Sequence, residues 1–329
     1  MPRALNAQHD RFPLSRPFRI ARGVKTFADV ITVTIVDGEI AGRGEGVPYP
    51  RYGESVEASL AAIETARAAV ESGAGRQVLQ SLLPPGAARN AVDCALWDLE
   101  ARQSGIDVAG LAGLRAPGRL VSALTLGIDT PQAMAQVAAL NSESPLLKVK
   151  VDAEDPAARI RAVRAAAPKA AIIVDPNESW DQRLLEEMQA VLLEAEVDLV
   201  EQPVPAESDS WLAGFVPAVP ICADEAIHVA ADLDRIALRY QGINVKLDKT
   251  GGLTAALELA NAARARGLIL MTGCMVSSSL SIAPALHVAA FSDFVDLDGP
   301  LWLREDRQGG VRDEGGYLVP PEAGFWGNM

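Results

Sequence analysis

The sequence predicts an α/β protein, a modified (β/α)8 TIM-type barrel with an α+β capping domain, and three observations support this prediction. Short apolar runs recur from about residue 120 onward in the 329-residue chain. Alanine-rich segments separate most of these runs, as expected for parallel strands that are covered by helices. Polar residues recur near the end of run after run. That recurrence favours a closed ring over a doubly wound open sheet, whose ligands gather at one switch point.

The first third of the chain has the pattern of a small α+β unit. A loop is expected over residues 18–28, and the alternating, β-branched segment 30–36 is expected to be a strand. Asp37-Gly38 then predicts a tight turn into a second strand. Helical periodicity predicts two helices, within 54–73 and 86–105, the second of which ends at a glycine.

Eight apolar runs are predicted to form the strands of the barrel. They lie at residues 120–128, 146–151, 170–177, 197–203, 219–225, 242–249, 268–275 and 294–300. Successive runs end about 25 residues apart, which is enough for one strand and one crossover helix. The domains predicted from this organisation are an α+β domain over 1–118, the barrel over 119–300, and a C-terminal tail over 301–329 that returns to the α+β domain.

Composition and charge argue against several classes of protein. There are 30 Lys+Arg against 43 Asp+Glu, a net charge of −13, and no basic cluster, which argues against nucleic acid as a partner. The cysteines, Cys94, Cys222 and Cys274, lie far apart in apolar segments and are expected to be buried thiols in a reducing compartment. No signal-peptide core and no apolar run of roughly 18 residues is visible. A cytoplasmic protein without a membrane partner is expected. Whether it forms a homo-oligomer is left open.

Three successive predicted strands end in acids, namely Asp175, Glu201 and Asp224. Inward-facing side chains at one level of a barrel converge, and three carboxylates there would repel one another unless a cation joined them. An all-oxygen donor set suits Mg²⁺, or Mn²⁺, with one ion per subunit. The plainer alternative for any one of these acids is a salt bridge or a helix cap at the end of its strand.

Lysine-bearing strands flank the acidic strands on both sides. Lys148 and Lys150 share one face of the preceding strand, and Lys246 lies on the strand that follows. In a ring, Lys150 and Lys246 would lie on opposite sides of the metal, so one could take a proton from a carbon and the other could return one to the opposite face. Lys148, as a neighbouring positive charge, would help to keep a base neutral. Alternatively, these lysines extend from the strand ends to solvent.

This order of Lys-x-Lys, Asp, Glu, Asp and Lys on successive strands resembles the muconate-lactonising subgroup of the enolase superfamily over nearly the whole chain. The resemblance implies a capping domain, a modified barrel and one bound Mg²⁺ per subunit. The roles that it implies are metal binding for Asp175, Glu201 and Asp224, acid/base catalysis for Lys150 and Lys246 with help from Lys148, and orientation of these groups by Asn177 and Glu225.

The eighth run resembles a narrower group. Asp296 and Asp298 face the barrel mouth by strand alternation, and they resemble the Asp-x-Asp feature with which dipeptide epimerases take the α-ammonium group of the substrate. The segments PYPRYGES, VDPNESW and INVKLDKTGGLT further resemble the proteobacterial L-Ala-D/L-Glu epimerases, which act in the recycling of cell-wall (murein) peptides. The activity implied is inversion of the Cα of the C-terminal residue of a dipeptide.

In that family, loops of the capping domain contact the side chain of the residue that is epimerised. The corresponding candidates are Arg22, Lys25, Arg51 and Tyr52. Lys25 stands where close relatives have arginine. A guanidinium group that can bind a carboxylate with two parallel hydrogen bonds is thus replaced by a single ammonium group.

Other activities stay open. Within the same subgroup they are N-acylamino acid racemisation, cycloisomerisation and o-succinylbenzoate synthesis. From a different class, a Schiff-base aldolase barrel would also use a buried lysine, and a barrel could bind metabolites without turnover.

Overall fold

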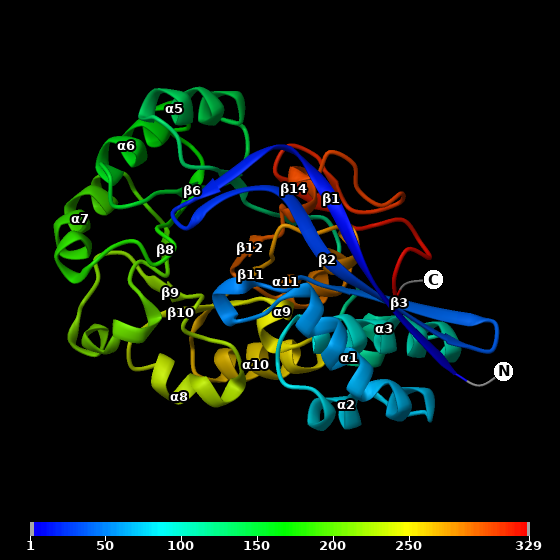
Figure 1. Cartoon of the computed structure of the whole chain (residues 1–329). Coiled ribbons are helices and arrows are strands. Elements are labelled where there is room, and N and C mark those ends of the chain that lie inside the picture. Colours follow the sequence, from blue (N-terminus) through cyan, green and yellow to red (C-terminus); the bar gives the residue numbers. More distant parts are fainter. Residues whose placement is uncertain (1–2, 328–329) are drawn as a thin grey trace.

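Eight parallel strands form the centre of the computed structural model, which describes residues 3–327 (Figure 1). Each strand pairs with the next one along the chain. The strands are β5 Leu124–Leu126, β6 Leu146–Lys150, β7 Ala171–Asp175, β8 Leu199–Glu201, β9 Ile221–Ala223, β10 Gly242–Val245, β11 Ile269–Gly273 and β12 Phe294–Asp296. The Ala123 amide donates to the Val295 carbonyl at 2.8 Å, which joins the two ends of the sheet and nearly closes the ring. The predicted (β/α)8 barrel is confirmed.

Helices connect most of the strands along the outside of the barrel (Figure 1). They are α5 Pro131–Leu140, α6 Pro156–Ala166, α7 Gln182–Glu194, α8 Leu233–Ile236, α9 Leu247–Thr250, α10 Leu253–Ala265 and α11 Ser279–Ala289, with the short 3-10 helix η4 Ala230–Asp232. The side chains of Thr130, Asp155 and Asp181 cap the starts of α5, α6 and α7. Between β8 and β9 the chain forms only two 3-10 helices, η2 Ala206–Ser208 and η3 Ser210–Gly214. Within residues 3–327 no helix is long and apolar enough to cross a membrane.

The first third of the chain forms a three-stranded antiparallel sheet. Its strands are β1 Ala4–Ile20, β2 Gly23–Asp37 and β3 Ile40–Gly46. The predicted turn at Asp37-Gly38 is confirmed, because it joins β2 to β3. The loop predicted over residues 18–28 is wrong: Phe18 pairs with Lys25 across a tight turn, and the segment continues β1 into β2. Ala21 and Arg22 form the turn, Gly23 follows it at φ 141°, and pairing satisfies backbone groups that a loop would leave to water.

The two helices predicted for the first third are confirmed as α1 Val56–Glu71 and α3 Ala87–Ser104. Helix α3 packs on β3, where glycine occupies every second position. A Cβ atom at Gly42, Gly44 or Gly46 would collide with the α3 backbone, so these glycines let the helix lie directly on the sheet. The sequence pattern does not predict three shorter helices, η1 Pro50–Tyr52, α2 Arg76–Leu82 and α4 Val108–Ala112.

The chain beyond residue 300 returns to the first third. The elements of this region are η5 Gly299–Trp302, β13 Arg312–Asp313 and β14 Tyr317–Val319, with β14 pairing with β4 Leu120–Val121. The Arg304 amide donates to the Pro13 carbonyl at 2.8 Å, and the Val108 amide donates to the Gly327 carbonyl at 2.9 Å. The division into domains at residues 118 and 300 stays a prediction.

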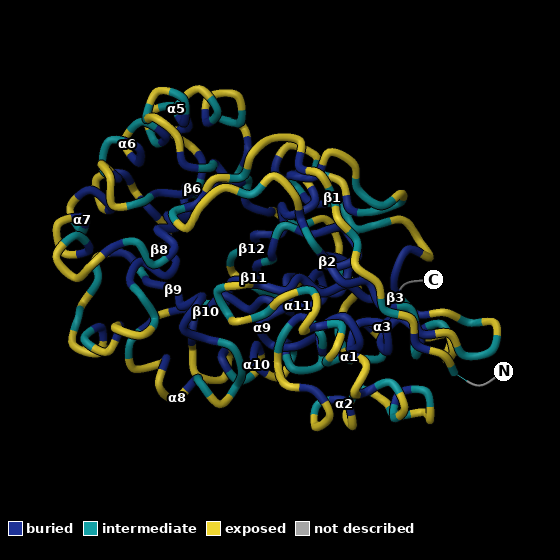
Figure 2. The backbone as a smooth tube through the Cα atoms, in the orientation of Figure 1, coloured by how far each residue is buried: buried dark blue, intermediate teal, exposed yellow. Residues whose placement is uncertain are grey.

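Apolar side chains fill the interior of the barrel beneath its C-terminal end. Leu146, Ile173, Leu199, Cys222 and Met271 belong to one buried cluster on the central strands, and Figure 2 shows these strands as buried. Because side chains alternate along a strand, the residues two positions after these leucine, isoleucine and cysteine side chains also point inward, one layer higher. The fold therefore sets a polar layer on top of an apolar one.

Candidate active site

Charged residues make up this higher layer and continue above it. They are Lys148 and Lys150 on β6, Asp175 and Glu201 at the ends of β7 and β8, and Asp224 and Lys246 directly after β9 and β10. Each of the six residues is at most 7% exposed. Charges buried to this degree must pair with one another, because removing an unpaired charge from water is costly.

A cavity lies above this layer, between the barrel and residues of the first third of the chain such as Phe18 and Tyr49. The predicted site residues that line it are Arg22, Lys25, Tyr52, Lys148, Lys150, Asn177, Asp224, Lys246, Asp296 and Asp298. Asp175 and Glu201 are fully buried and do not line the cavity, and neither do Arg51 and Glu225. Most of the residues that the sequence predicts for one site therefore surround one cavity.

Lys148 lies among three carboxylates. Its Nζ is 2.6 Å from Glu201 Oε2, 2.7 Å from Asp296 Oδ2 and 3.0 Å from Asp175 Oδ2. Burial lowers the pKa of Lys148, but attraction to these three acids outweighs burial and holds the pKa well above its ordinary value. Carboxylates from three strands therefore compensate the positive charge of Lys148, and its predicted effect on Lys150 stays a prediction.

Lys150 and Lys246 are held in similar ways on the two sides of the acids. Lys150 Nζ lies 2.5 Å from Asp175 Oδ2 and 3.0 Å from the side-chain oxygen of Asn177. Lys246 Nζ lies 2.7 Å from Asp224 Oδ2. Burial lowers the pKa of Lys246, but the neighbouring carboxylates, Asp224 first, raise it above its ordinary value. Both amines line the same cavity and each is oriented by one acid.

Asp175, Glu201 and Asp224 carry donors of the kind that a divalent cation prefers. All three are buried carboxylates, and burial and the charge of Asp175 raise the pKa of Glu201 to about 7. Within the described part of the chain, Glu201 Oε2 accepts no hydrogen bond, and it forms an ion pair of 2.6 Å with Lys148. Lysines lie between the acids, and within residues 3–327 no three His, Cys, Asp or Glu side chains are arranged to hold an ion. The chemistry of the donors nevertheless fits Mg²⁺ or Mn²⁺.

Asp296 and Asp298 differ in what they leave for a ligand. Asp296 Oδ2 is bound by Lys148, whereas Asp296 Oδ1 is buried without a hydrogen-bond partner in the described chain. Asp298 Oδ2 accepts hydrogen bonds from the Thr125 amide at 2.8 Å and from the Trp302 indole at 3.3 Å. Burial and the charge of Asp296 raise the pKa of Asp298 to about 6. Asp296 therefore keeps a free buried acceptor, while Oδ2 of Asp298 joins the segment after β12 to β5.

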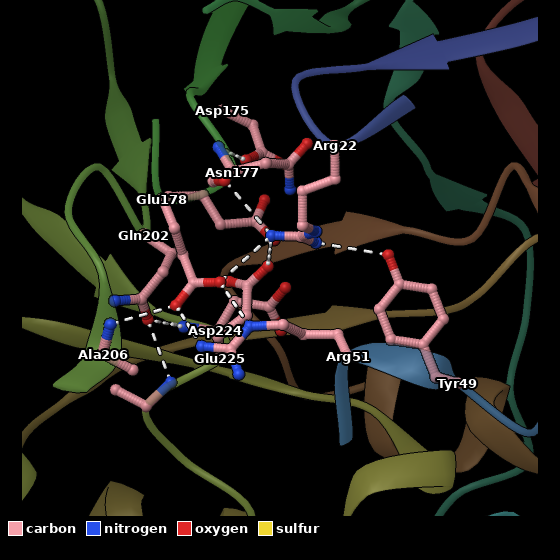
Figure 3. A network of polar contacts seen from close by, with 12 residues as sticks. Arg22, Tyr49, Arg51, Asp175, Asn177, Glu178, Gln202, Ala206, Asp224 and Glu225 are labelled. Carbon is pink, nitrogen blue, oxygen red and sulfur yellow. Dashed lines mark hydrogen bonds and ion pairs between the residues drawn. The ribbon is translucent and has the colours of Figure 1, made fainter. Parts of the chain in front are cut away.

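Two arginines join the first third of the chain to the barrel through Glu178 (Figure 3). Arg22 Nη1 lies 2.7 Å from Glu225 Oε1 and 3.2 Å from Glu178 Oε2. Arg51 makes two hydrogen bonds of 2.8 Å to Glu178 and an ion pair of 2.6 Å with Glu207. Because its guanidinium is occupied and lies outside the cavity lining, the structure does not support the prediction that Arg51 contacts a substrate.

Lys25 differs from the two arginines. It lies on β2 beside the hairpin turn, and its Nζ is 4.5 Å from the centre of the Tyr49 ring. It makes no ion pair with the residues from 3 to 327, and burial lowers its pKa. Tyr52 also lines the cavity and packs edge-on against His228. Lys25 is thus a cation on the roof of the cavity that is left for an anionic ligand.

Three buried polar residues of the site are not predicted from the sequence. Asn244 donates to Glu201 Oε1 at 2.9 Å. It lies two residues before Lys246, so strand alternation could have identified it. Gln202 lies directly after β8 with left-handed backbone at φ 32°, and Lys249 lies on the short helix α9, so no strand period applies to either residue.

Two family models match the chain. The model described as "Mandelate racemase / muconate lactonizing enzyme, N-terminal domain" matches residues 4–113, and the model described as "Enolase C-terminal domain-like" matches residues 132–325. The L-Ala-D/L-Glu epimerase of Escherichia coli (strain K12) is 44% identical over 306 residues, which are 92% of this chain and 95% of the relative. The N-acetyl-D-glutamate racemase of Pseudoalteromonas sp. is 44% identical over 301 residues, 91% of this chain and 95% of the relative.

Solved structures are similar over the same length. An enolase family member from Agrobacterium tumefaciens, with bound sodium and L-Ala-L-Glu, has a TM-score of 0.97 at 49% identity and covers 99% of this chain and 100% of its own. A dipeptide epimerase from Methylococcus capsulatus, complexed with Mg and the dipeptide L-Arg-D-Lys, has a TM-score of 0.89 at 33% identity and covers 98% of each chain. The similarity thus includes both the barrel and the sheet of the first third.

Proposed function

The chain belongs to the mandelate racemase/muconate lactonizing enzyme family of the enolase superfamily, and from this premise we propose that it is a magnesium-dependent dipeptide epimerase with L-Ala-D/L-Glu as its substrate pair. One observation carries the proposal. Lys150 and Lys246 line a single cavity, and the strands that bear them flank the strands that lead to Asp175, Glu201 and Asp224. Two amines so placed suit inversion of one carbon rather than a one-sided reaction.

We assign the acid/base steps to these two lysines. One neutral amine removes the Cα proton of the C-terminal residue, and the ammonium group of the other lysine delivers a proton to the opposite face of the carbon. The pair holds one transferable proton before and after the step, so the configuration inverts without a net change in protonation. Asp175 and Asp224 fix the two Nζ atoms at 2.5 and 2.7 Å, which keeps both amines aimed into the cavity.

We propose that Asp175, Glu201 and Asp224 hold the Mg²⁺. The bound ion would stabilise the negative charge that develops as the Cα proton leaves, and it would offset the carboxylate charge that otherwise keeps the lysines protonated. Asn244 holds Glu201 Oε1, and Oε2 forms an ion pair with Lys148. We propose that Lys148, which contacts acids from three strands, aligns these acids rather than acting on the substrate.

The unpartnered Asp296 Oδ1 supports a substrate with a free α-ammonium group, and we assign this oxygen as its acceptor. Racemisation of an N-acylamino acid is a second candidate function, because the N-acetyl-D-glutamate racemase and the L-Ala-D/L-Glu epimerase match this chain at the same identity, 44%. An N-acetyl group carries no positive charge for Asp296. A higher kcat/KM for L-Ala-L-Glu than for N-acetylglutamate supports the epimerase, and the reverse order supports the racemase.

Incubation of a dipeptide library in D₂O with Mg²⁺ tests the proposed function directly. We expect deuterium at the Cα of the C-terminal residue, together with inversion, and fastest labelling for Ala-Glu dipeptides. Mass spectrometry identifies the labelled peptides, and chiral chromatography measures their inversion. Absence of deuterium from every Cα would overturn the epimerase proposal.

We expect Lys25→Ala to reduce the preference for glutamate. A hydrogen bond between charged groups contributes about 1.5–3 kcal/mol, so kcat/KM for L-Ala-L-Glu should fall about 10- to 100-fold. The value for L-Ala-L-Leu should change little, because that side chain has no carboxylate. Lys25→Arg should retain the preference, and the exposed Lys169→Ala serves as a control. Equal losses for both dipeptides would contradict a role of Lys25 in specificity.

We also propose that the protein acts in the cytoplasm in the recycling of cell-wall peptides, as its resemblance to the proteobacterial epimerases implies. Three cysteines that are all free thiols agree with a reducing compartment. Assembly into a homo-oligomer stays a prediction, which light scattering of the purified chain would test.

A further inference from the structure

Lys249 is a buried lysine that takes no part in the proposed reaction. It lies on α9, three residues after Lys246, and its side chain is 1% exposed. Its Nζ lies 2.5 Å from the Asp224 carbonyl, 2.6 Å from Asp224 Oδ1 and 2.9 Å from the Asn244 carbonyl. An ammonium group has three hydrogens, so these contacts use all of them. Lys249 does not line the cavity and is not placed to exchange a proton with a substrate.

The contacts of Lys249 complete a set of restraints around Asp224. The Asp224 amide donates to Gln202 Oε1 at 2.9 Å, which fixes the main chain from β8. Lys249, which follows Asp224 in the sequence, donates to the Asp224 carbonyl and to Oδ1. Lys246 donates to Oδ2 at 2.7 Å. Each carboxylate oxygen therefore has one lysine. This division fixes the rotation of the carboxylate about its Cβ–Cγ bond.

Lys249 also reaches a second acid of the site indirectly. Asn244, whose carbonyl accepts from Lys249, donates from its side chain to Glu201 Oε1 at 2.9 Å. Charge compensation alone does not explain the residue, because Lys246 already lies 2.7 Å from Asp224. The second lysine instead fixes the orientation of the Asp224 carboxylate. Because Lys249 binds Oδ1, only Oδ2 is left to face the cavity.

We propose that Lys249 is a positioning residue, which holds Asp224 Oδ1 and the Asn244 main chain so that Asp224 presents Oδ2 alone to Lys246 and to the cation. The inference rests on the proposed function, because that function makes Asp224 a metal ligand. Without Lys249, the Asp224 carboxylate is free to rotate. Lys246 could then bind both oxygens, which would remove an oxygen from the cation and draw the amine away from the substrate.

Titration calorimetry of the full chain with MgCl₂, in the absence of substrate, tests the inference. Lys249→Met keeps the aliphatic stem but removes the ammonium group. Loss of a group that orients a metal-binding carboxylate typically weakens metal binding 10- to 100-fold, and we expect weakening of about this size. A lysine that served only as a charge would predict the opposite, because removing a positive charge near the cation strengthens its binding. Unchanged or tighter Mg²⁺ binding would overturn the inference.

Two further variants keep the test decisive. Lys249→Gln gives the same comparison if Lys249→Met does not fold, because one amide group cannot donate to all three acceptors. Weaker Mg²⁺ binding by this variant supports the inference, and equal or tighter Mg²⁺ binding overturns it. Lys169→Met removes an exposed lysine and should leave Mg²⁺ affinity unchanged. If the native chain binds no Mg²⁺, the proposed function itself is overturned. If the native chain binds Mg²⁺ and both Lys249 variants bind it equally well, only the positioning role is overturned.

Discussion

Lys246→Ala and Lys150→Ala are each expected to lower the rate of epimerisation about 10²- to 10⁴-fold, the range over which a positioned acid or base contributes. Inversion needs a proton removed from one face of Cα and another delivered to the opposite face, so neither lysine can replace the other. Lys148 cannot substitute for them either, because three carboxylates occupy its ammonium group.

The two variants should differ in the epimer that they still label. In D₂O, each should exchange the Cα proton of only one epimer, and the two variants should select opposite epimers. Proton NMR of L-Ala-L-Glu and L-Ala-D-Glu, supplied separately, measures this directly. Lys169→Ala controls for the general effect of removing a lysine. Retention of full epimerisation in either variant, or selection of the same epimer by both, would contradict the two-base mechanism.

Strand alternation explains why so much of the site was predictable. Lys150, Asp175, Glu201, Asp224 and Lys246 lie at or just beyond the ends of short apolar strands, and the barrel brings all such positions to one end. A period of two residues and a regular βα repeat are local properties of the sequence. The prediction of these residues as neighbours therefore needed only the ring, which the structure confirms.

The features that the sequence did not predict have a different physical origin, because they depend on contacts between distant segments. Lys148 was expected to act as a neighbouring positive charge, and its pairing with Asp296, which compensates that charge, spans 148 positions in the chain. Arg51 was expected at the substrate, and it is held instead by Glu178 and Glu207. Likewise, a loop was expected over residues 18–28, where cross-strand pairing extends a hairpin. None of these partners can be identified from periodicity.

The charges of the site also show why the cation and the lysines must act together. Lys148 and Lys150 both contact Asp175 Oδ2, and Lys246 lies 2.7 Å from Asp224 and 3.8 Å from Glu201. Each acid proposed as a metal ligand is thus also a partner of a lysine. A change in the charge of the acids must alter the readiness of the amines to accept a proton. Metal binding and base strength are consequently coupled in one layer of the barrel.

Removal of divalent cations is therefore expected to abolish activity, and Glu201→Gln should do so even with Mg²⁺ present. A metal ion contributes several kcal/mol of charge stabilisation in reactions of this kind, so a loss of about 10³-fold or more is expected. Dialysis against EDTA, followed by the dipeptide exchange assay and readdition of Mg²⁺, measures the effect. Mg²⁺ at about 100 times its Kd should also stabilise the native chain by about 2.7 kcal/mol, and should do so less in Glu201→Gln.

The same experiment separates the epimerase from a Schiff-base aldolase. An imine between a lysine and a carbonyl substrate needs no metal, and borohydride would trap it as a stable adduct. The epimerase predicts no adduct and restoration of exchange when Mg²⁺ is returned. Glu201→Gln keeps the size of the side chain and its acceptor for Asn244, and its Tm without metal, measured beside that of the native chain, checks that the variant is folded. Full activity after EDTA treatment, or in Glu201→Gln, would contradict metal-assisted proton transfer. The proposed role of the lysines, which depends on the cation, would then be contradicted as well.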